Sequence, residues 1–390
     1  MEEELNLYQE LYKDYSDIKS PIGAVRYLSE PLINKLNHQI SHQHQIVNEG
    51  NSVLDRVISS FEFGQGSFKI LIWSQMHGNE STTTKAVYDL IYYFLNSKFK
   101  NSDEADLLNH LRIKIIPVLN PDGSFAWTRT NANQVDLNRD AKDQSQPETK
   151  LLMRIIDDFK PDFCFNMHDQ RSVFEAEESQ AAQLSFLSAS YRKDRSLNET
   201  RLKSMHVINS MHQVLQKFIP EQIGRYDDAF NINCFGDYLH ARALPTVLVE
   251  AGHSGNDYAR ERTRQLCFIG LIRALIELKD FQTSENSDIY YHSIPENSKN
   301  YTDLLIKNYS VSETETLDVS IRYREILSEK STLIFEPYID QIGNLDHIYG
   351  HQTMDAELED IQINSEKIEL QTIVKSLTIS ENDFVMRFEI

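Results

Sequence analysis

Short apolar runs alternate with amphipathic stretches from residue 68 to residue 279, and this alternation limits the possible folds more than any other feature. Four runs have the length and composition of buried strands: Phe68–Trp73, Ile113–Leu119, Phe163–Met167 and Thr246–Val249. Helical periodicity or helix-type composition fills the stretches that start near Ser81, at Pro147, near residue 200 and near residue 259. Strands that alternate with helices predict an α/β sheet covered on both faces.

Four polar residues stand just after three of these expected strands. His77 and Glu80 come after the first strand, His168 after the third and Glu250 after the fourth. In an α/β sheet the ligand crevice lies at the carboxyl ends of the strands. We therefore expect these four side chains to meet in one site.

The two ends of the chain follow other patterns. Residues 1–50 are polar with short apolar clusters, and we expect helices there that decorate the main domain. The composition shifts at residues 282–288, which predicts a linker between a first domain over 1–285 and a second over 286–390. Two runs beyond the linker alternate with period two: Leu317, Val319, Ile321, Tyr323 and Phe384, Met386, Phe388, Ile390. The second domain is therefore expected to be small and β-rich, with no motif that indicates its role.

The charge balance excludes some classes of partner. The formal net charge is −20, from 59 acidic and 39 basic residues. Nucleic acid and anionic membranes need clustered Lys and Arg, so neither is expected as a partner. The chain shows no run of about 18 apolar residues and no basic, apolar start of a secretory signal. With three cysteines in no paired spacing, we expect a cytoplasmic protein; its oligomeric state stays open.

The segment His77-Gly-Asn-Glu80 carries the first indication of chemistry. Zinc accepts imidazole nitrogen and carboxylate oxygen, and a catalytic zinc site uses three protein ligands plus water. A His and a Glu three residues apart in a Gly-containing turn can reach one ion. The motif alone is unspecific, because most such spacings are accidental and a polar loop that caps the next helix gives the same pattern.

Further segments follow this motif in a fixed order. They are Asn120-Pro-Asp-Gly123, Arg129, Val135-Asp-Leu-Asn-Arg139, Asn166-Met-His-Asp169 and Leu248-Val-Glu-Ala251. The ordered set resembles the zinc metallocarboxypeptidases, the family of carboxypeptidase A, and the related zinc amidases and deacylases. The resemblance spans roughly residues 50–280. It implies a mixed, mostly parallel sheet of the zinc carboxypeptidase type for the first domain.

The resemblance also implies a role for the residues at the strand ends. His77, Glu80 and His168 would hold one Zn²⁺ per chain. Asp136 matches the carboxylate that supports the first zinc histidine, and such partners fix the orientation of the ring. Glu250 matches the general base, which takes a proton from water and passes it to the leaving amine. A turn-forming Asp and a solvated Glu are the alternatives for Asp136 and Glu250.

Three basic or polar residues match the substrate-binding positions of the family. Arg129 would stabilise the oxyanion, because a fixed cation aimed at developing charge lowers the barrier. Asn138 and Arg139 would bind a substrate carboxylate, for which the guanidinium fork is suited. Surface ion pairs are the alternative for both arginines.

The sequence departs from the family pattern at two points. Asp140 stands where the peptidases commonly have a neutral Asn, and an acid there disfavours simple anionic C-termini or favours a substrate amine. The active-site tyrosine of the peptidases has no unambiguous match. Tyr226 lies at about the right distance before Glu250 and is the candidate.

Three functions remain open at this point. The first is a metallopeptidase that cleaves an amide bond next to a free carboxylate. The second is a deacylase or amidase of small N-acyl amino acids, which uses the same metal, base and arginines. The third is a non-catalytic binding protein on the same scaffold, which the presence of Glu250 and all three zinc ligands disfavours. The expected substrate is accordingly a peptide or an N-acyl amino acid.

Overall fold

A mixed β-sheet forms the centre of the first domain in the computed structural model, which describes residues 2–96, 99, 103–281, 286–312, 314–380 and 382–389. Among these residues its strands are β1 (Ile46–Asn51), β2 (Val57–Phe63), β3 (Phe68–Ser74), β4 (Leu111–Ile116), β5 (Phe163–Asp169), β6 (Leu184–Ser188), β7 (Ile223–Arg225) and β8 (Thr246–Ala251). They lie in the order β1-β2-β4-β3-β5-β8-β6-β7. The central strands β4, β3, β5 and β8 run parallel, and β7 runs parallel to β6. The pairs β1–β2, β2–β4 and β6–β8 are antiparallel.

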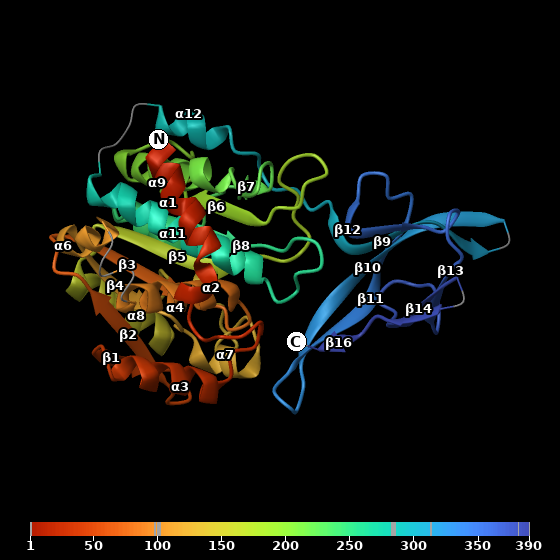
Figure 1. The fold of residues 1–390 in the computed structure, drawn as a ribbon, viewed down its shortest axis with the longest axis horizontal. Coiled ribbons are helices and arrows are strands. Elements are labelled where there is room, and N and C mark those ends of the chain that lie inside the picture. The colour runs from red at the N-terminus through yellow and green to blue at the C-terminus, as the bar shows by residue number, and fades with distance from the viewer. Residues whose placement is uncertain are drawn as a thin grey trace.

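Helices cover both faces of this sheet (Figure 1). The helices that carry the two cores are α4 (Thr82–Leu95), α9 (Glu199–Leu215), α11 (Glu261–Lys279), α8 (Pro147–Phe159) and α10 (Phe235–Ala241). Successive side chains of a strand point to opposite faces. Ile72 of β3 accordingly packs in the core under α4, α9 and α11, and Trp73 packs in the core under α8 and α10. This architecture confirms the predicted α/β fold class.

Short helices connect the larger elements. They are η1 (Asp103–Asp106), α6 (Leu107–His110), α7 (Pro121–Ala126), η2 (Leu137–Arg139) and α12 (Ser287–His292). None of the helices in the described ranges is long and apolar enough to span a membrane.

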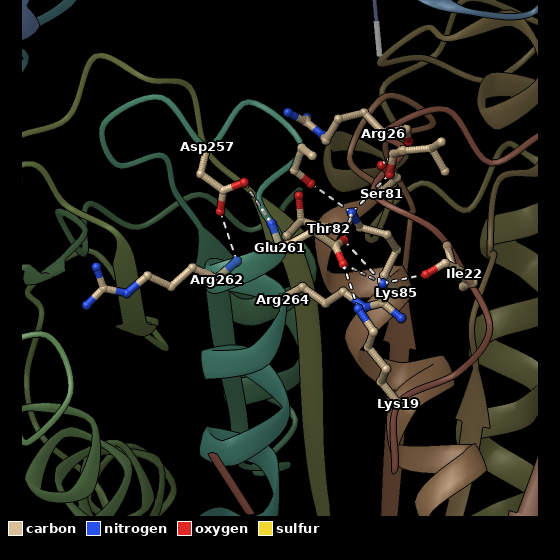
Figure 2. A network of polar contacts seen from close by, with 12 residues as sticks. Lys19, Ile22, Arg26, Ser81, Thr82, Lys85, Asp257, Glu261, Arg262 and Arg264 are labelled. Atoms are coloured by element: carbon tan, nitrogen blue, oxygen red, sulfur yellow. Dashed lines mark hydrogen bonds and ion pairs between the residues drawn. The ribbon is translucent and has the colours of Figure 1, made fainter. Parts of the chain in front are cut away.

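The N-terminal segment forms helices α1 (Glu2–Lys13), α2 (Tyr15–Ile18) and α3 (Glu30–Ser41), and it also contributes the edge strand β1. A buried polar network fixes this segment to the domain (Figure 2). Arg264 of α11 donates to the carbonyl of Ile22 at 2.9 Å and forms two hydrogen bonds to the Asp89 carboxylate of α4. The Lys85 amine donates to the carbonyl of Val25 at 2.9 Å.

The second domain consists of two small sheets. The strands are β9 (Tyr301–Ser312), β10 (Glu315–Leu327), β11 (Leu333–Gly343), β12 (Tyr349–Asp355), β13 (Ile361–Ser365), β14 (Val374–Ile379), β15 (Asn382–Val385) and β16 (Phe388–Glu389). They form the sheets β12-β9-β10-β11-β16 and β13-β14-β15 in the described part of the chain, with a shared apolar core. The β-rich character expected for this region is confirmed.

Two details of the expected organisation differ or stay open. The alternation from Phe384 to Ile390 predicts one strand, but β15 and β16 join different sheets, and Ile390 lies outside the described residues. The expected boundary after residue 285 falls beside residues that the structure does not describe, so it stays a prediction. The helix α12 that follows packs against α9, and its Tyr291 is buried in the core of the first domain.

The second domain lies against the loops that leave the carboxyl ends of the central strands (Figure 1). The loop after β5 accepts a hydrogen bond from His351 at the Ser172 carbonyl, at 2.8 Å. In the loop after β8, the ring of Tyr258 packs at 5.2 Å from that of Tyr323 of β10. Because these loops surround the predicted site, the second domain forms part of its surroundings.

Candidate metal centre

Three donor side chains converge at the carboxyl ends of β3 and β5. His77 and Glu80 lie in the turn after β3, and His168 lies near the end of β5. The Nδ1 atom of His77 is 2.8 Å from one Glu80 carboxylate oxygen, and the Nδ1 atom of His168 is 2.8 Å from the other. One ligand atom from each residue lies within 4.8 Å of the others, and all three side chains are buried.

The arrangement of the two imidazole rings fits a bound cation. The Nδ1 atoms of His77 and His168 face each other at 3.1 Å. Two neutral nitrogens whose lone pairs face each other repel, and a shared cation removes that repulsion. The set of two imidazoles and one carboxylate is a donor set of catalytic zinc sites, with a further position left for water. The three side chains therefore fit Zn²⁺.

Asp136 contacts the His77 ring at Nε2, the nitrogen that does not face the metal position. Its Oδ1 lies 2.9 Å from Nε2 of His77 and also accepts the backbone N–H of Asn138. This contact leaves the Nδ1 lone pair of His77 directed at the metal position. Arg129 donates to the other Asp136 oxygen at 3.0 Å and to Glu80 at 3.3 Å. Despite its partial burial, His77 and Arg129 hold the pKa of Asp136 well below its usual range.

We expect Asp136→Asn to weaken zinc binding by about 10- to 100-fold, the usual cost of removing such a supporting carboxylate. The amide would keep the shape but lose the charge that orients and polarises the His77 ring. Competition with a chelator of known zinc affinity measures the change. Exchange of the exposed Asp157 for Asn is the matched control, and equal zinc affinity in both variants would contradict the supporting role.

Glu250 lies on β8, the strand beside the one that carries His168. The two residues are direct partners in the parallel pairing of β5 and β8. Burial and the nearby carboxylates of Glu80 and Asp169 raise the pKa of Glu250, and Arg129 acts against this shift. In the described part of the chain no side chain makes a hydrogen bond or ion pair to the Glu250 carboxylate, so it is available to a water or a substrate.

Tyr226 follows β7 and lies within electrostatic reach of the same centre. Its pKa is raised first by burial and then by the negative charges of Glu250 and Glu80. Its ring packs edge-on against Phe174, with 5.2 Å between the ring centroids. The structure therefore brings the tyrosine candidate to the site; its role stays a prediction.

Asn138 and Arg139 lie in the turn η2, which is attached to the start of α10. The Asn138 side-chain oxygen accepts the backbone N–H of Phe235 at 3.0 Å. Arg139 donates to the Asn138 carbonyl at 2.8 Å and to the sulfur of Cys234 at 3.2 Å, and its side chain is exposed. These contacts leave donors of both side chains free for a substrate carboxylate.

Two further acids near the centre, Asp140 and Asp169, accept hydrogen bonds from the backbone. The Asp140 carboxylate accepts the backbone N–H groups of Ser145 and Gln146, both at 2.9 Å. These bonds lower its pKa against the effect of burial, and the side chain is only 3% exposed. Asp140 therefore holds a turn and does not meet the substrate. Asp169 accepts the backbone N–H groups of Thr82 and Thr83 and so caps α4.

Comparison with known proteins places the centre in a family. The family model described as zinc carboxypeptidase matches residues 30–280, well over half of the chain. The chain belongs to the zinc carboxypeptidase family. The predicted family, the predicted class of zinc hydrolase and the predicted zinc ligands His77, Glu80 and His168 are thereby confirmed.

Named relatives of this chain match over short segments. Carboxypeptidase D of Anas platyrhynchos is 31% identical over 123 residues, which are 27% of this chain and 9% of the relative. Carboxypeptidase M of Mus musculus is 31% identical over 137 residues, which are 29% of this chain and 30% of the relative. The aligned segments thus span less than a third of either relative, and its activity does not transfer directly.

Solved structures support the fold. A metallo-carboxypeptidase from Burkholderia cenocepacia superimposes with a TM-score of 0.54 at 20% identity, over 66% of this chain and 71% of that one. A metallo-carboxypeptidase from Pseudomonas aeruginosa gives a TM-score of 0.53 at 15% identity over the same shares. The structural similarity leaves about a third of this chain without a counterpart.

Residues from outside the family motifs also border the centre. A cavity of about 30 Å³ is lined by Glu80 and Arg129 together with Arg26, Arg260 and Glu325. Arg26 comes from the N-terminal segment and Glu325 from the second domain, and neither belongs to a motif that the sequence could reveal. Two larger cavities, of about 630 and 660 Å³, are lined mainly by the N-terminal helices, α4 and α7 and contain none of the metal ligands. We assign the chemistry to the side of the smaller cavity, because Glu80, one of the three zinc ligands, lines it together with Arg129.

Proposed function

We propose that this zinc carboxypeptidase hydrolyses the amide bond that precedes a free C-terminal carboxylate of a peptide. The observation that carries the proposal is the convergence of His77, Glu80 and His168 beside Glu250, at the carboxyl ends of three parallel strands. When bound there, zinc lowers the pKa of a coordinated water to about 7 and polarises the carbonyl to be cleaved.

The protein supplies proton transfer and charge stabilisation. Glu250 takes a proton from the attacking water and passes it to the leaving amine, for which its raised pKa is suited. Arg129 lies next to Glu80 and directs its remaining N–H donors at the oxygen on which negative charge develops. Tyr226 brings a hydroxyl to the Glu250 side of the centre, where it binds the substrate backbone.

The free carboxylate of the substrate is bound by Asn138 and Arg139. Both come from one short turn, which the hydrogen bond from Phe235 fixes to α10. A guanidinium binds a carboxylate through paired N–H donors, and the exposed Arg139 keeps such donors free. This clamp sets the position of the bond to be cleaved relative to Glu250.

A comparison of free acids with their amides tests this function. We expect the zinc-loaded protein to cleave blocked dipeptides with a free C-terminus and to cleave the C-terminal amides of the same peptides at least about tenfold more slowly. In Arg139→Ala that preference should largely disappear through a rise in KM for the free acids, because the amides never used the charge. The ratio of kcat/KM between acid and amide is the measured quantity.

The same assay distinguishes the alternatives. Arg242→Ala removes an exposed arginine that pairs with Asp157 away from the centre, and it should leave the acid-to-amide ratio unchanged. Turnover of N-acyl amino acids without turnover of dipeptides would instead support a deacylase. No hydrolysis of either class by protein with one bound zinc would contradict the proposed function.

A further inference from the structure

Three arginines gather between the metal centre and the second domain. Arg26 comes from the N-terminal segment, Arg171 from the loop after β5, and Arg260 from the turn before α11. Together with Glu325 of β10 they line two adjoining cavities of about 30 Å³ each. Arg26 and Arg260 are only 2% and 5% exposed, whereas Arg171 is exposed. We call these three residues the arginine cluster.

The two buried guanidinium groups lack full compensation. Arg26 lies 3.8 Å from Asp169 and 3.4 Å from Glu325, and Arg260 lies 4.0 Å from Asp169. Hydrogen-bonded ion pairs are shorter, at about 2.7–2.9 Å. The Nε atoms of Arg26 and Arg260 are buried and have no hydrogen-bond partner among the described residues. Arg260 donates to the Ala251 carbonyl at 2.8 Å and Arg26 to the Tyr258 carbonyl at 3.5 Å, so each guanidinium is satisfied only in part. Buried charges are usually paired and hydrogen-bonded, so two partly satisfied buried arginines indicate a site for an anion.

The acids near the cluster do not neutralise it. The Asp169 carboxylate accepts a hydrogen bond from the N-terminus of α4, at 2.8 Å from the backbone nitrogen of Thr82. Glu325 accepts a hydrogen bond from the indole N–H of Trp127 at 3.2 Å and keeps 16% of its side chain exposed. In the described part of the chain Arg171 makes no ion pair. Burial and the neighbouring positive charge of Arg26 lower the pKa of Arg260 to about 10.

One buried amine holds both inner arginines in place. Lys85 donates to the carbonyl of Val25 at 2.9 Å and to the carbonyl of Ala259 at 2.8 Å, the residues just before Arg26 and Arg260. Figure 2 shows Lys85 within this network and the side chain of Arg26 extending away from it. The backbone under the cluster is therefore fixed before any ligand binds, which lowers the ordering cost of binding.

The cluster is continuous with the metal centre. The second cavity is lined by the cluster and also by Glu80 and Arg129, so the cluster and two residues of the metal centre border one space. Asn138 and Arg139, which we assign to the C-terminal carboxylate, line neither cavity. Because the cluster shares a cavity with Arg129 but not with Asn138 and Arg139, we assign it to the amino-terminal side of the bond to be cleaved. About 30 Å³ accommodates little more than water, so a ligand must take the place that the Glu325 carboxylate fills.

We propose that the arginine cluster binds an acidic side chain of the substrate residue that precedes the cleaved bond. Glu325 occupies this position without substrate and turns out toward solvent when a substrate carboxylate replaces it. One carboxylate replaces another, so the number of negative charges beside the buried arginines does not change. The inference rests on the proposed hydrolase function and specifies its substrate class, namely peptides with a Glu- or Asp-like residue before the C-terminal one.

The isosteric peptides acetyl-Glu-Xaa and acetyl-Gln-Xaa test this subsite, with Xaa the C-terminal residue that gives turnover. We expect the full-length zinc protein to prefer the Glu peptide, and Arg171→Gln to lower the Glu-to-Gln ratio of kcat/KM by about tenfold or more, as for a lost charge-assisted hydrogen bond. Glu325→Gln should raise the same ratio, because the competing charge is removed while the acceptor for Trp127 remains.

A matched control and a binding measurement complete the test. Arg324→Gln removes a charge from the opposite face of β10, where Arg324 is exposed, and should leave the ratio unchanged. Calorimetry with acetylglutamate and acetylglutamine as probes measures binding without turnover. The same ratio in wild type, Arg171→Gln and Glu325→Gln, in turnover and in binding, would overturn the subsite. If neither peptide is cleaved but acetylglutamate binds and Arg171→Gln weakens it, the proposed function fails while the subsite stands.

Discussion

Glu250→Gln should lower kcat by about 10²- to 10⁴-fold, the range that a general acid–base residue contributes. The amide has the shape of the carboxylate but cannot accept the proton of the attacking water. We expect kcat and kcat/KM to fall together, because the lost interaction is made only in the transition state. Steady-state kinetics on a blocked dipeptide with a free C-terminus measures the loss.

The zinc content of Glu250→Gln shows whether the fall in kcat comes from the lost base or from lost metal. Glu250 is not among the three donors that converge, so Glu250→Gln should keep about one zinc per chain, as expected for a single catalytic site. Glu199→Gln changes an exposed acid in the first turn of α9 and serves as the control with unchanged turnover and metal. Retained activity with full zinc occupancy would remove Glu250 from the role of base.

The sequence was sufficient for the part of the centre that lies at strand ends. The register of β5 and β8 sets His168 opposite Glu250, and both follow apolar strands whose ends are visible in the sequence. The ligands at His77 and Glu80 have a fixed short spacing. Because such features are local, the order of the motifs along the chain was enough to predict that these side chains meet.

The sequence was not sufficient for residues that reach the centre from separate parts of the fold. Arg26 and Glu325 are far apart in the chain and approach to 3.4 Å only because the second domain packs against the N-terminal segment. Asp140 shows the opposite error. Its place beside Arg139 suggested that its charge disfavours anionic C-termini or favours a substrate amine, yet its hydrogen bonds to Ser145 and Gln146 direct the carboxylate into the turn. Side-chain direction of this kind depends on tertiary contacts.

The C-terminal alternation illustrates a further limit. Phe384, Met386 and Phe388 keep period two, but the chain leaves one sheet and enters another between Val385 and Phe388. Periodicity reports the buried face of a strand and contains no information on which neighbour the strand pairs with.

Asp89→Ala should destabilise the first domain by about 3–5 kcal/mol, because it leaves a buried arginine without its partner. Asp89 and Arg264 are both fully buried and form two hydrogen bonds of 2.7 and 2.8 Å. Asp89 also accepts the hydroxyl of Tyr15 at 2.6 Å and the backbone N–H of Ser20 at 2.8 Å. The Ser20 hydroxyl donates to it as well, so the variant also removes the acceptor of three donors of the N-terminal segment. Urea unfolding followed by tryptophan fluorescence measures the loss of free energy of unfolding.

Asp157→Ala is the matched control for this ion pair. Asp157 pairs with Arg242 at the surface, where 57% and 42% of the two side chains are exposed, and exposed pairs contribute about 0–1 kcal/mol. Asp89→Asn keeps one acceptor oxygen, so its loss of free energy of unfolding should lie between those of Asp89→Ala and Asp157→Ala. This variant preserves the test if Asp89→Ala does not fold. Similar losses for Asp89→Asn and Asp157→Ala would show that the buried pair does not anchor the N-terminal segment. A large loss of free energy of unfolding in the Asp89 variants alone would instead show that the buried network stabilises the domain. Because Arg264 also donates to the carbonyl of Ile22, the same network then holds the backbone that precedes Arg26.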